Sequence, residues 1–304
     1  MVTPFLESGF LTRIFRLSRS ASILSTIRFC CRANIDKANA PELELGRISS
    51  KKNLISLHCS LMLQGTKARI NESTKARKTE NMKTIVLASQ KGGAGKTTLA
   101  AHLAVAAEGA GDGPCVILDT DPQASLANWW NERNDESPAF APATLKELSA
   151  KLEALAKAGY AYAFIDTPPA ITESIRAVVM QADFVLIPTR PSPHDLRAVG
   201  LTVELTAGAD RSFAFAVTQA KPNARLTVQA MAALSQHGVV APSIIHDRVD
   251  YASSMIDGRT VLEIDPRGRS AAEMRELWTF VKAQINESTK ARKHDLTKGR
   301  KNKL

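Results

Sequence analysis

Cysteine is scarce in this chain of 304 residues, which contains only four. They stand at Cys30, Cys31, Cys59 and Cys115, and they form no CxxC pair and no cluster with the spacing of metal ligands. Disulfide-rich domains and structural zinc sites both depend on such clusters, so we expect neither. The pattern is typical of a reducing compartment, and we expect the protein to be soluble and cytoplasmic.

Long apolar runs and aromatic residues are also lacking. No apolar stretch reaches the roughly 18 residues that a membrane-spanning helix requires, so the sequence predicts no membrane span. Aromatic residues make up 5% of the chain, whereas hydrophobic residues make up 44%. A core of aliphatic side chains is typical of a buried parallel sheet covered by alanine-rich helices.

Acidic residues are depleted at the two ends of the chain. Residues 1–81 contain 14 Lys and Arg against 6 Asp and Glu, and residues 285–304 contain 7 against 2. The formal net charge of +10 therefore resides in the ends, because residues 82–284 contain 19 basic and 22 acidic residues. Overall charge alone does not indicate that the body of the chain binds nucleic acid.

We expect three segments: a disordered basic extension at 1–81, one domain at 82–284, and a basic flexible tail at 285–304. The arginine- and serine-rich start resembles an organellar transit peptide, but the interpretation that we favour is a start codon set too far upstream, with translation beginning at Met82. Residues 67–78 and 282–293 match at 11 of 12 positions, which indicates a duplicated stretch of coding sequence. Two copies are too few for a repeat architecture.

From Met82 onward, short apolar runs alternate with helical patterns. We expect strands that include 213–217 and 243–245, and helices near 145–157, 172–182, 195–207, 225–237 and 270–284. Strands that alternate with helices of this length predict an α/β fold, a doubly wound and mostly parallel sheet with helices on both faces. In such sheets, ligands bind at the carboxyl ends of the strands.

The stretch from Ile85 to Thr98, IVLASQKGGAGKTT, carries the strongest chemical signal. An apolar strand runs into a glycine-rich turn that opens a helix, and glycines let backbone N–H groups close around phosphate oxygens. The helix N-terminus adds partial positive charge, Lys96 a full charge and Thr97 a hydroxyl for Mg²⁺. The residues that we expect to surround the phosphates are Gly92, Gly93, Ala94, Gly95, Lys96, Thr97 and Thr98.

One position departs from the P-loop pattern G-x-x-x-x-G-K-[ST]. Gln90 replaces its first glycine, and an additional lysine, Lys91, directly precedes the remaining glycines. A Gly/Lys-rich turn that binds no phosphate is the alternative. The order of strand, turn and helix favours the phosphate site.

Three aspartates follow two further apolar runs. Asp166 has the placement of a residue that holds Mg²⁺, directly or through water, while Asp119 and Asp121 follow the run 115–118. One of this pair can tie down the segment that follows, and the other can orient or polarise an attacking water. An aspartate at the end of a strand is often only a cap or turn residue, but the preceding P-loop favours a nucleotide site.

The motifs KGGAGKTT (91–98), DTDPQ (119–123) and IDTPP (165–169) resemble the deviant Walker A, Walker A′ and Walker B motifs of the ParA/MinD ATPases. The turn 188–193 and the segment after it resemble those of small ParA partition proteins that lack an N-terminal DNA-reading domain. The resemblance covers about 82–284. It implies a weak, partner-stimulated ATPase that uses ATP and Mg²⁺.

The resemblance also implies roles for individual residues. Lys91 would reach the phosphates of a partner subunit in an ATP-dependent homodimer, and the turn with Pro191 and Pro193 would lie near the dimer interface. Asp121 would serve hydrolysis, and Asp119 would couple Mg²⁺ to the switch segment. A charged lysine opposite phosphates is favourable only when ATP is bound, so dimerisation depends on the nucleotide.

Family members of this type bind DNA without sequence preference and associate with the nucleoid. The resemblance therefore implies partition of plasmid or chromosomal DNA together with a ParB-like or ribbon-helix-helix centromere-binding protein. Such DNA binding relies on phosphate contacts and weakens steeply with salt. Our candidates for those contacts are Arg248, Arg267 and Arg269.

Three other functions stay open at this point. A MinD-like ATPase acts on a membrane through a terminal amphipathic helix, and the apolar stripe from Met274 to Ile285 has that spacing, although docking on the body is the commoner use. A related ATPase that positions a protein cluster is the second alternative. A P-loop kinase or amidoligase is the third, but no acceptor-binding constellation is visible.

Overall fold

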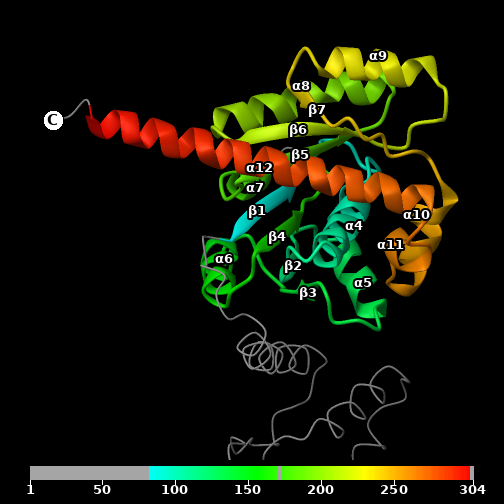
Figure 1. Ribbon diagram of the computed structural model, residues 1–304, viewed down its shortest axis with the longest axis horizontal. Coiled ribbons are helices and arrows are strands. Elements are labelled where there is room, and N and C mark those ends of the chain that lie inside the picture. The colour runs from blue at the N-terminus through cyan, green and yellow to red at the C-terminus, as the bar shows by residue number, and fades with distance from the viewer. Residues whose placement is uncertain (1–81, 170–172, 302–304) are drawn as a thin grey trace, which may run out of the picture. The chain divides into compact units, whose positions relative to one another are not determined.

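The computed structural model describes residues 82–169 and 173–301. Within them, seven strands form one sheet in the order β3-β2-β4-β1-β5-β6-β7, and every pair of neighbours is parallel (Figure 1). The strands are β1 (Lys83–Leu87), β2 (Cys115–Asp119), β3 (Ala139–Phe140), β4 (Tyr162–Asp166), β5 (Phe184–Thr189), β6 (Ser212–Val217) and β7 (Val239–Val240). The predicted α/β fold is confirmed.

Helices cover both faces of this sheet (Figure 1). They are α4 (Lys96–Gly109), α5 (Ser125–Glu132), α6 (Leu148–Lys157), α7 (Glu173–Val179), α8 (Pro193–Gly208), α9 (Arg225–Leu234), α10 (Val249–Ser254), α11 (Val261–Ile264) and α12 (Arg269–Lys301), with a 3₁₀ helix, η2 (Met255–Asp257). Side chains alternate between the faces along each strand, as the pleat requires. Ile85 and Leu87 pack toward α4, α5 and α12, while Val86 packs toward the face that α6 to α9 cover.

The apolar stripe of α12 is packed against the body. Met274, Leu277, Trp278, Val281 and Ile285 are each at most 2% exposed. Asp112, in the loop after α4, accepts hydrogen bonds from Trp278 Nε1 at 2.9 Å and from Lys282 Nζ at 2.6 Å. The stripe is therefore part of the core, as we expected, and it is not a free lipid-binding face. No helix in 82–169 and 173–301 is long and apolar enough to cross a membrane.

Two predictions about individual elements are wrong. The strand expected at 243–245 is absent, and β7 lies at Val239–Val240 instead. Ala241 and Ile245 still donate backbone hydrogen bonds to Phe215 and Val217, but Pro242 between them has no N–H and interrupts the ladder. The last helix does not end at residue 284.

Helix α12 continues from Arg269 to Lys301, because this stretch contains no proline and no glycine before Gly299 that would end it near 284. The proposed domain boundary at 284 stays a prediction, with the observation that Ile285 is still buried. The predicted extension at 1–81 lies outside the described residues.

Candidate functional site

The glycine-rich turn between β1 and α4 has the backbone of a phosphate-binding loop. Gly93 and Gly95 adopt φ angles of +71° and +94°, which only glycine adopts readily. No described residue accepts a hydrogen bond from the backbone N–H groups of residues 92–95. Unpaired N–H groups at the start of a 14-residue helix are suited to an anionic ligand.

Two residues after β6 hold this turn from outside. The Thr218 hydroxyl donates to the carbonyl oxygen of Ala94 at 2.9 Å, and Gln219 Nε2 donates to the carbonyl oxygen of Gly93 at 2.6 Å. The turn thus has its carbonyl groups engaged on one side and its N–H groups free. The sequence pattern indicates neither residue, because it predicts β6 only as a strand and the residues after it match no motif.

Lys96 is a buried cation with no ion pair to any described residue. The residue is 7% exposed, and its Nζ lies 3.5 Å from the carbonyl oxygen of Lys91. Burial lowers the pKa of Lys96, although the charges of Asp166 and Asp121 act in the opposite direction. A buried ammonium of this kind is stabilised by a bound anion, as a phosphate would be. Thr97 and Thr98 follow it in the first turn of α4.

Asp166, at the end of β4, has the environment of a magnesium ligand. Thr97 Oγ1 donates to its Oδ2 at 2.5 Å, while its Oδ1 is buried without a hydrogen-bond partner. Burial raises the pKa of Asp166 to about 7, and the neighbouring charges of Asp119 and Asp121 act in the same direction. Mg²⁺ prefers oxygen ligands, so the Thr97 hydroxyl and the Asp166 carboxylate, whose Oδ1 is unpaired, fit this ion.

This carboxyl gives the unliganded protein a testable pH dependence. In the unfolded chain Asp166 loses its proton near its ordinary pKa of 3.8, whereas in the folded chain it keeps the proton up to a pKa of about 7. The free energy of unfolding therefore falls as the pH rises from about 4 toward 7. The largest loss that this group can cause is about 4 kcal/mol. We expect Asp166→Asn to reduce the fall in urea-unfolding free energy between pH 5 and pH 8. A fall equal to that of wild type and of the exposed control Asp135→Asn would contradict this assignment.

Asp119 and Asp121 lie at the same edge of the sheet. Asp119 is in register with Asp166 on the neighbouring strand β4. Its carboxylate accepts from the backbone N–H groups of Asp121, Leu126 and Ala127 at 2.9 to 3.0 Å, so it binds Asp121 and the first turn of α5 to the end of β2. Asp121 is half-buried, and only its Oδ1 has a partner in the described residues, the N–H of Gln123 at 2.9 Å. Asp121 is thus the freer of the two carboxylates.

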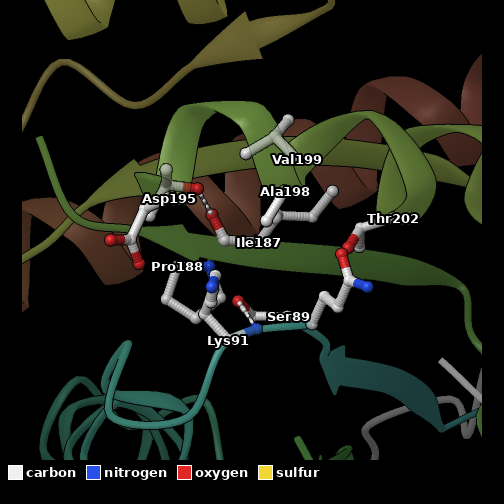
Figure 2. Close-up of a pocket in the computed structure, with 10 residues that line it drawn as sticks. Ser89, Lys91, Ile187, Pro188, Asp195, Ala198, Val199 and Thr202 are labelled. Atoms are coloured by element: carbon white, nitrogen blue, oxygen red, sulfur yellow. Dashed lines mark hydrogen bonds between the residues drawn. The ribbon is translucent and has the colours of Figure 1, made fainter. Parts of the chain in front are cut away.

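Lys91 is exposed at the edge of this site. It borders a small pocket between the turn after β1 and helix α8 (Figure 2). Figure 2 shows Ser89 and Lys91 on one side of the pocket and Asp195, Val199 and Thr202 of α8 on the other. Pro191 and Pro193 stand at the start of α8, where Ser192 is the N-cap residue. The roles of Lys91 and the two prolines at an interface between two copies stay predictions.

The three arginines predicted to contact DNA differ in their surroundings. Arg248 donates from Nε and Nη2 to Glu273 at 3.2 and 2.8 Å, so its guanidinium is engaged within the protein. The same carboxylate accepts from His246 and Tyr251. Arg267 and Arg269 are exposed, and no described side chain pairs with either guanidinium. Arg248 is thus a poorer candidate for a phosphate contact than the other two.

Comparisons with known proteins agree with this geometry. A sequence model of the CobQ/CobB/MinD/ParA nucleotide binding domain matches residues 85–261. The maintenance of carboxysome distribution protein A of Halothiobacillus neapolitanus is 29% identical over 199 residues, covering 62% of this chain and 91% of that protein. Protein ParA of Rhizobium radiobacter is 28% identical over 222 residues, covering 69% of this chain and 99% of that protein.

A solved structure extends the comparison to three dimensions. A variant of McdA from Cyanothece in complex with ATP superposes with a TM-score of 0.54 at 20% identity, covering 68% of this chain and 97% of that chain. At this level of identity, the likeness shows a common fold.

Proposed function

Because this chain belongs to the ParA/MinD family of ATPases, whose nucleotide-binding domain matches residues 85–261, we propose that it is an ATP-driven switch. Two copies associate when ATP is bound, the pair binds DNA without sequence preference, and hydrolysis separates them. The observation that carries the proposal is the gathering of buried Lys96, the Thr97–Asp166 pair and the freer carboxylate of Asp121 at one edge of the sheet.

Each of these groups has a defined task in the proposed reaction. The N–H groups of the turn and Lys96 bind the phosphates, while Thr97 and Asp166 hold Mg²⁺, directly or through water. When bound there, Mg²⁺ would supply positive charge that neutralises the phosphates. Asp121 orients the attacking water, and Asp119 holds Asp121 and the first turn of α5 in place through its three backbone hydrogen bonds. We expect slow hydrolysis that DNA and a partner protein accelerate.

The proposed cargo is plasmid or chromosomal DNA, with a ParB-like or ribbon-helix-helix protein as the stimulating partner. The 28% identity with Protein ParA of Rhizobium radiobacter supports this assignment. A second candidate is a large protein assembly, and the 29% identity with a carboxysome distribution protein favours it. Both cargoes use the same switch. The buried stripe of α12 argues against the membrane as a third cargo.

The ATPase assignment is tested by phosphate release with Mg²⁺ and ATP, alone, with DNA, and with DNA plus a centromere-binding or assembly-binding partner. We expect a low basal rate that rises with DNA and partner. Lys96→Gln keeps the side-chain length approximately but removes the buried charge, so we expect a loss of ATP binding of about 100-fold or more. A fast rate that is indifferent to DNA and partner would contradict the switch, and release of a phosphorylated small molecule would indicate a kinase.

The DNA-binding surface is tested by reversing the charge of two exposed arginines. Arg267→Glu with Arg269→Glu should weaken binding of the ATP-bound protein to any duplex by about tenfold or more, and each lost phosphate contact should reduce the salt slope by about one. Arg176→Glu with Lys146→Glu, at two exposed positions, is the control matched in charge. Binding of DNA with an unchanged salt slope would rule out this surface. Arg248→Glu is uninformative for this purpose because it breaks the contacts with Glu273.

A further inference from the structure

Arg190 brings a second cation to the phosphate-binding turn. It directly follows β5, which neighbours β1 in the sheet, so the loop after β5 lies beside the turn after β1. A Cβ placed on Gly93 would lie 3.8 Å from Nη1 of Arg190. The guanidinium therefore borders the turn at the same glycine whose carbonyl oxygen Gln219 holds.

One nitrogen of this guanidinium is anchored, and the other two are not. Arg190 Nε donates to Asp195 Oδ1 at 3.0 Å, and Asp195 is 4% exposed. Ser192 fixes this carboxylate in turn, because its hydroxyl also donates to Asp195. Nη1 and Nη2 have no hydrogen-bond partner among the described residues. An arginine oriented through Nε presents its remaining donors as a fork, which suits phosphate oxygens.

The order of the strands indicates which part of a bound nucleotide the Arg190 guanidinium contacts. Asp119 and Asp166 end β2 and β4, on one side of β1, whereas Arg190 follows β5 on the other side. Arg190, Gln219 and Lys221 also border a cavity of about 480 Å³. That volume falls within the range of small-ligand sites and exceeds the need of any single phosphate. Asp119, Asp121 and Asp166 are not among its lining residues, whereas Arg190 and Gln219, which border Gly93 of the turn, are.

We infer that Arg190 binds the α- and β-phosphates of the nucleotide, on the side opposite Mg²⁺. The inference rests on the proposed function, since it assumes that the turn binds ATP. This placement puts the terminal phosphate near Asp121 and Asp166 and the nucleoside in the cavity. The α- and β-phosphates, which ATP and ADP share, then lie beside Arg190. Asp195 is the positioning residue that aims the guanidinium.

The test is the affinity for ATP and for ADP, each with Mg²⁺, measured by titration calorimetry. Arg190→Gln should weaken both nucleotides by about tenfold or more and by a similar factor. Arg190→Lys keeps a charge for Asp195 but lacks the fork, so it should also weaken both. Arg197→Gln, an exposed position on α8, should leave both unchanged.

Three results would overturn the inference in different ways. Unchanged affinities in Arg190→Gln, with a lowered melting temperature, would show that the arginine only stabilises the start of α8 through Asp195. A loss confined to ATP would place the guanidinium at the terminal phosphate instead. If Arg190→Gln does not fold, the same readings are taken on Arg190→Lys, and unchanged affinities there overturn the inference. Failure of the wild type to bind ATP would refute the proposed function itself.

Discussion

Replacing Lys91 with alanine is expected to abolish ATP-dependent dimerisation while each protomer still binds ATP. Lys91 is exposed, and no described residue forms an ion pair with it, so its ammonium contributes little to the fold of a single chain. Truncation at such a position changes stability by roughly 0.5 kcal/mol or less. Loss of the dimer therefore reports a contact with the partner's phosphates.

The measurement for this prediction is sedimentation velocity with saturating ATP, together with ATP affinity by titration. We expect Lys91→Ala to sediment as a monomer and to bind ATP within about threefold of the wild type, a difference below 1 kcal/mol. The exposed Lys146→Ala is the matched control and should dimerise normally. A Lys91→Ala protein that still dimerises with ATP would remove the proposed role of this lysine.

Replacing Asp121 with alanine is expected to stop hydrolysis and leave dimerisation intact. General-base assistance and orientation of water contribute about 100-fold to 10,000-fold to such reactions, so we expect the rate to fall at least 100-fold. Because Asp121 is half-buried and makes one hydrogen bond, to the N–H of Gln123, the fold should be little affected. Phosphate release by the isolated variant, with and without DNA, is the measurement.

Asp119→Ala separates the two carboxylates of this motif. Loss of the Asp119 carboxylate leaves the backbone N–H groups of Asp121, Leu126 and Ala127 without their acceptor, which should destabilise the protein by about 1–3 kcal/mol. We therefore expect Asp119→Ala to lower the melting temperature and Asp121→Ala to leave it nearly unchanged. A normal rate of hydrolysis in Asp121→Ala would assign the water to another group.

The sequence predicted the part of the site that depends on strand order. Apolar strands followed by glycine or aspartate place Lys96, Asp119 and Asp166 at one sheet edge, because parallel strands end on the same side. The register of Asp119 with Asp166 follows from this topology. The structure adds the evidence for a magnesium site, because the unpaired Oδ1 of Asp166 cannot be inferred from the sequence.

The parts that escaped prediction depend on contacts between distant segments. Thr218 and Gln219 hold the phosphate turn from more than 120 residues away, and no local pattern announces that contact. In the sequence Arg248 has the pattern of a surface cation, but in the structure its guanidinium donates to Glu273 on α12. Arg190 stood in a proline-rich turn that sequence patterns mark only as a turn. Each of these contacts joins segments that are distant in the sequence, so a local sequence pattern does not predict it.

The most direct test of the switch is the mass of the Asp121→Ala protein in solution with ATP and with ADP, both with Mg²⁺ and at saturating concentration. Slow hydrolysis keeps the ATP state populated during the measurement, so sedimentation equilibrium compares two defined nucleotide states. The account predicts a dimer with ATP and a monomer with ADP. The same mass with both nucleotides would contradict it, because dimerisation would then not depend on the terminal phosphate.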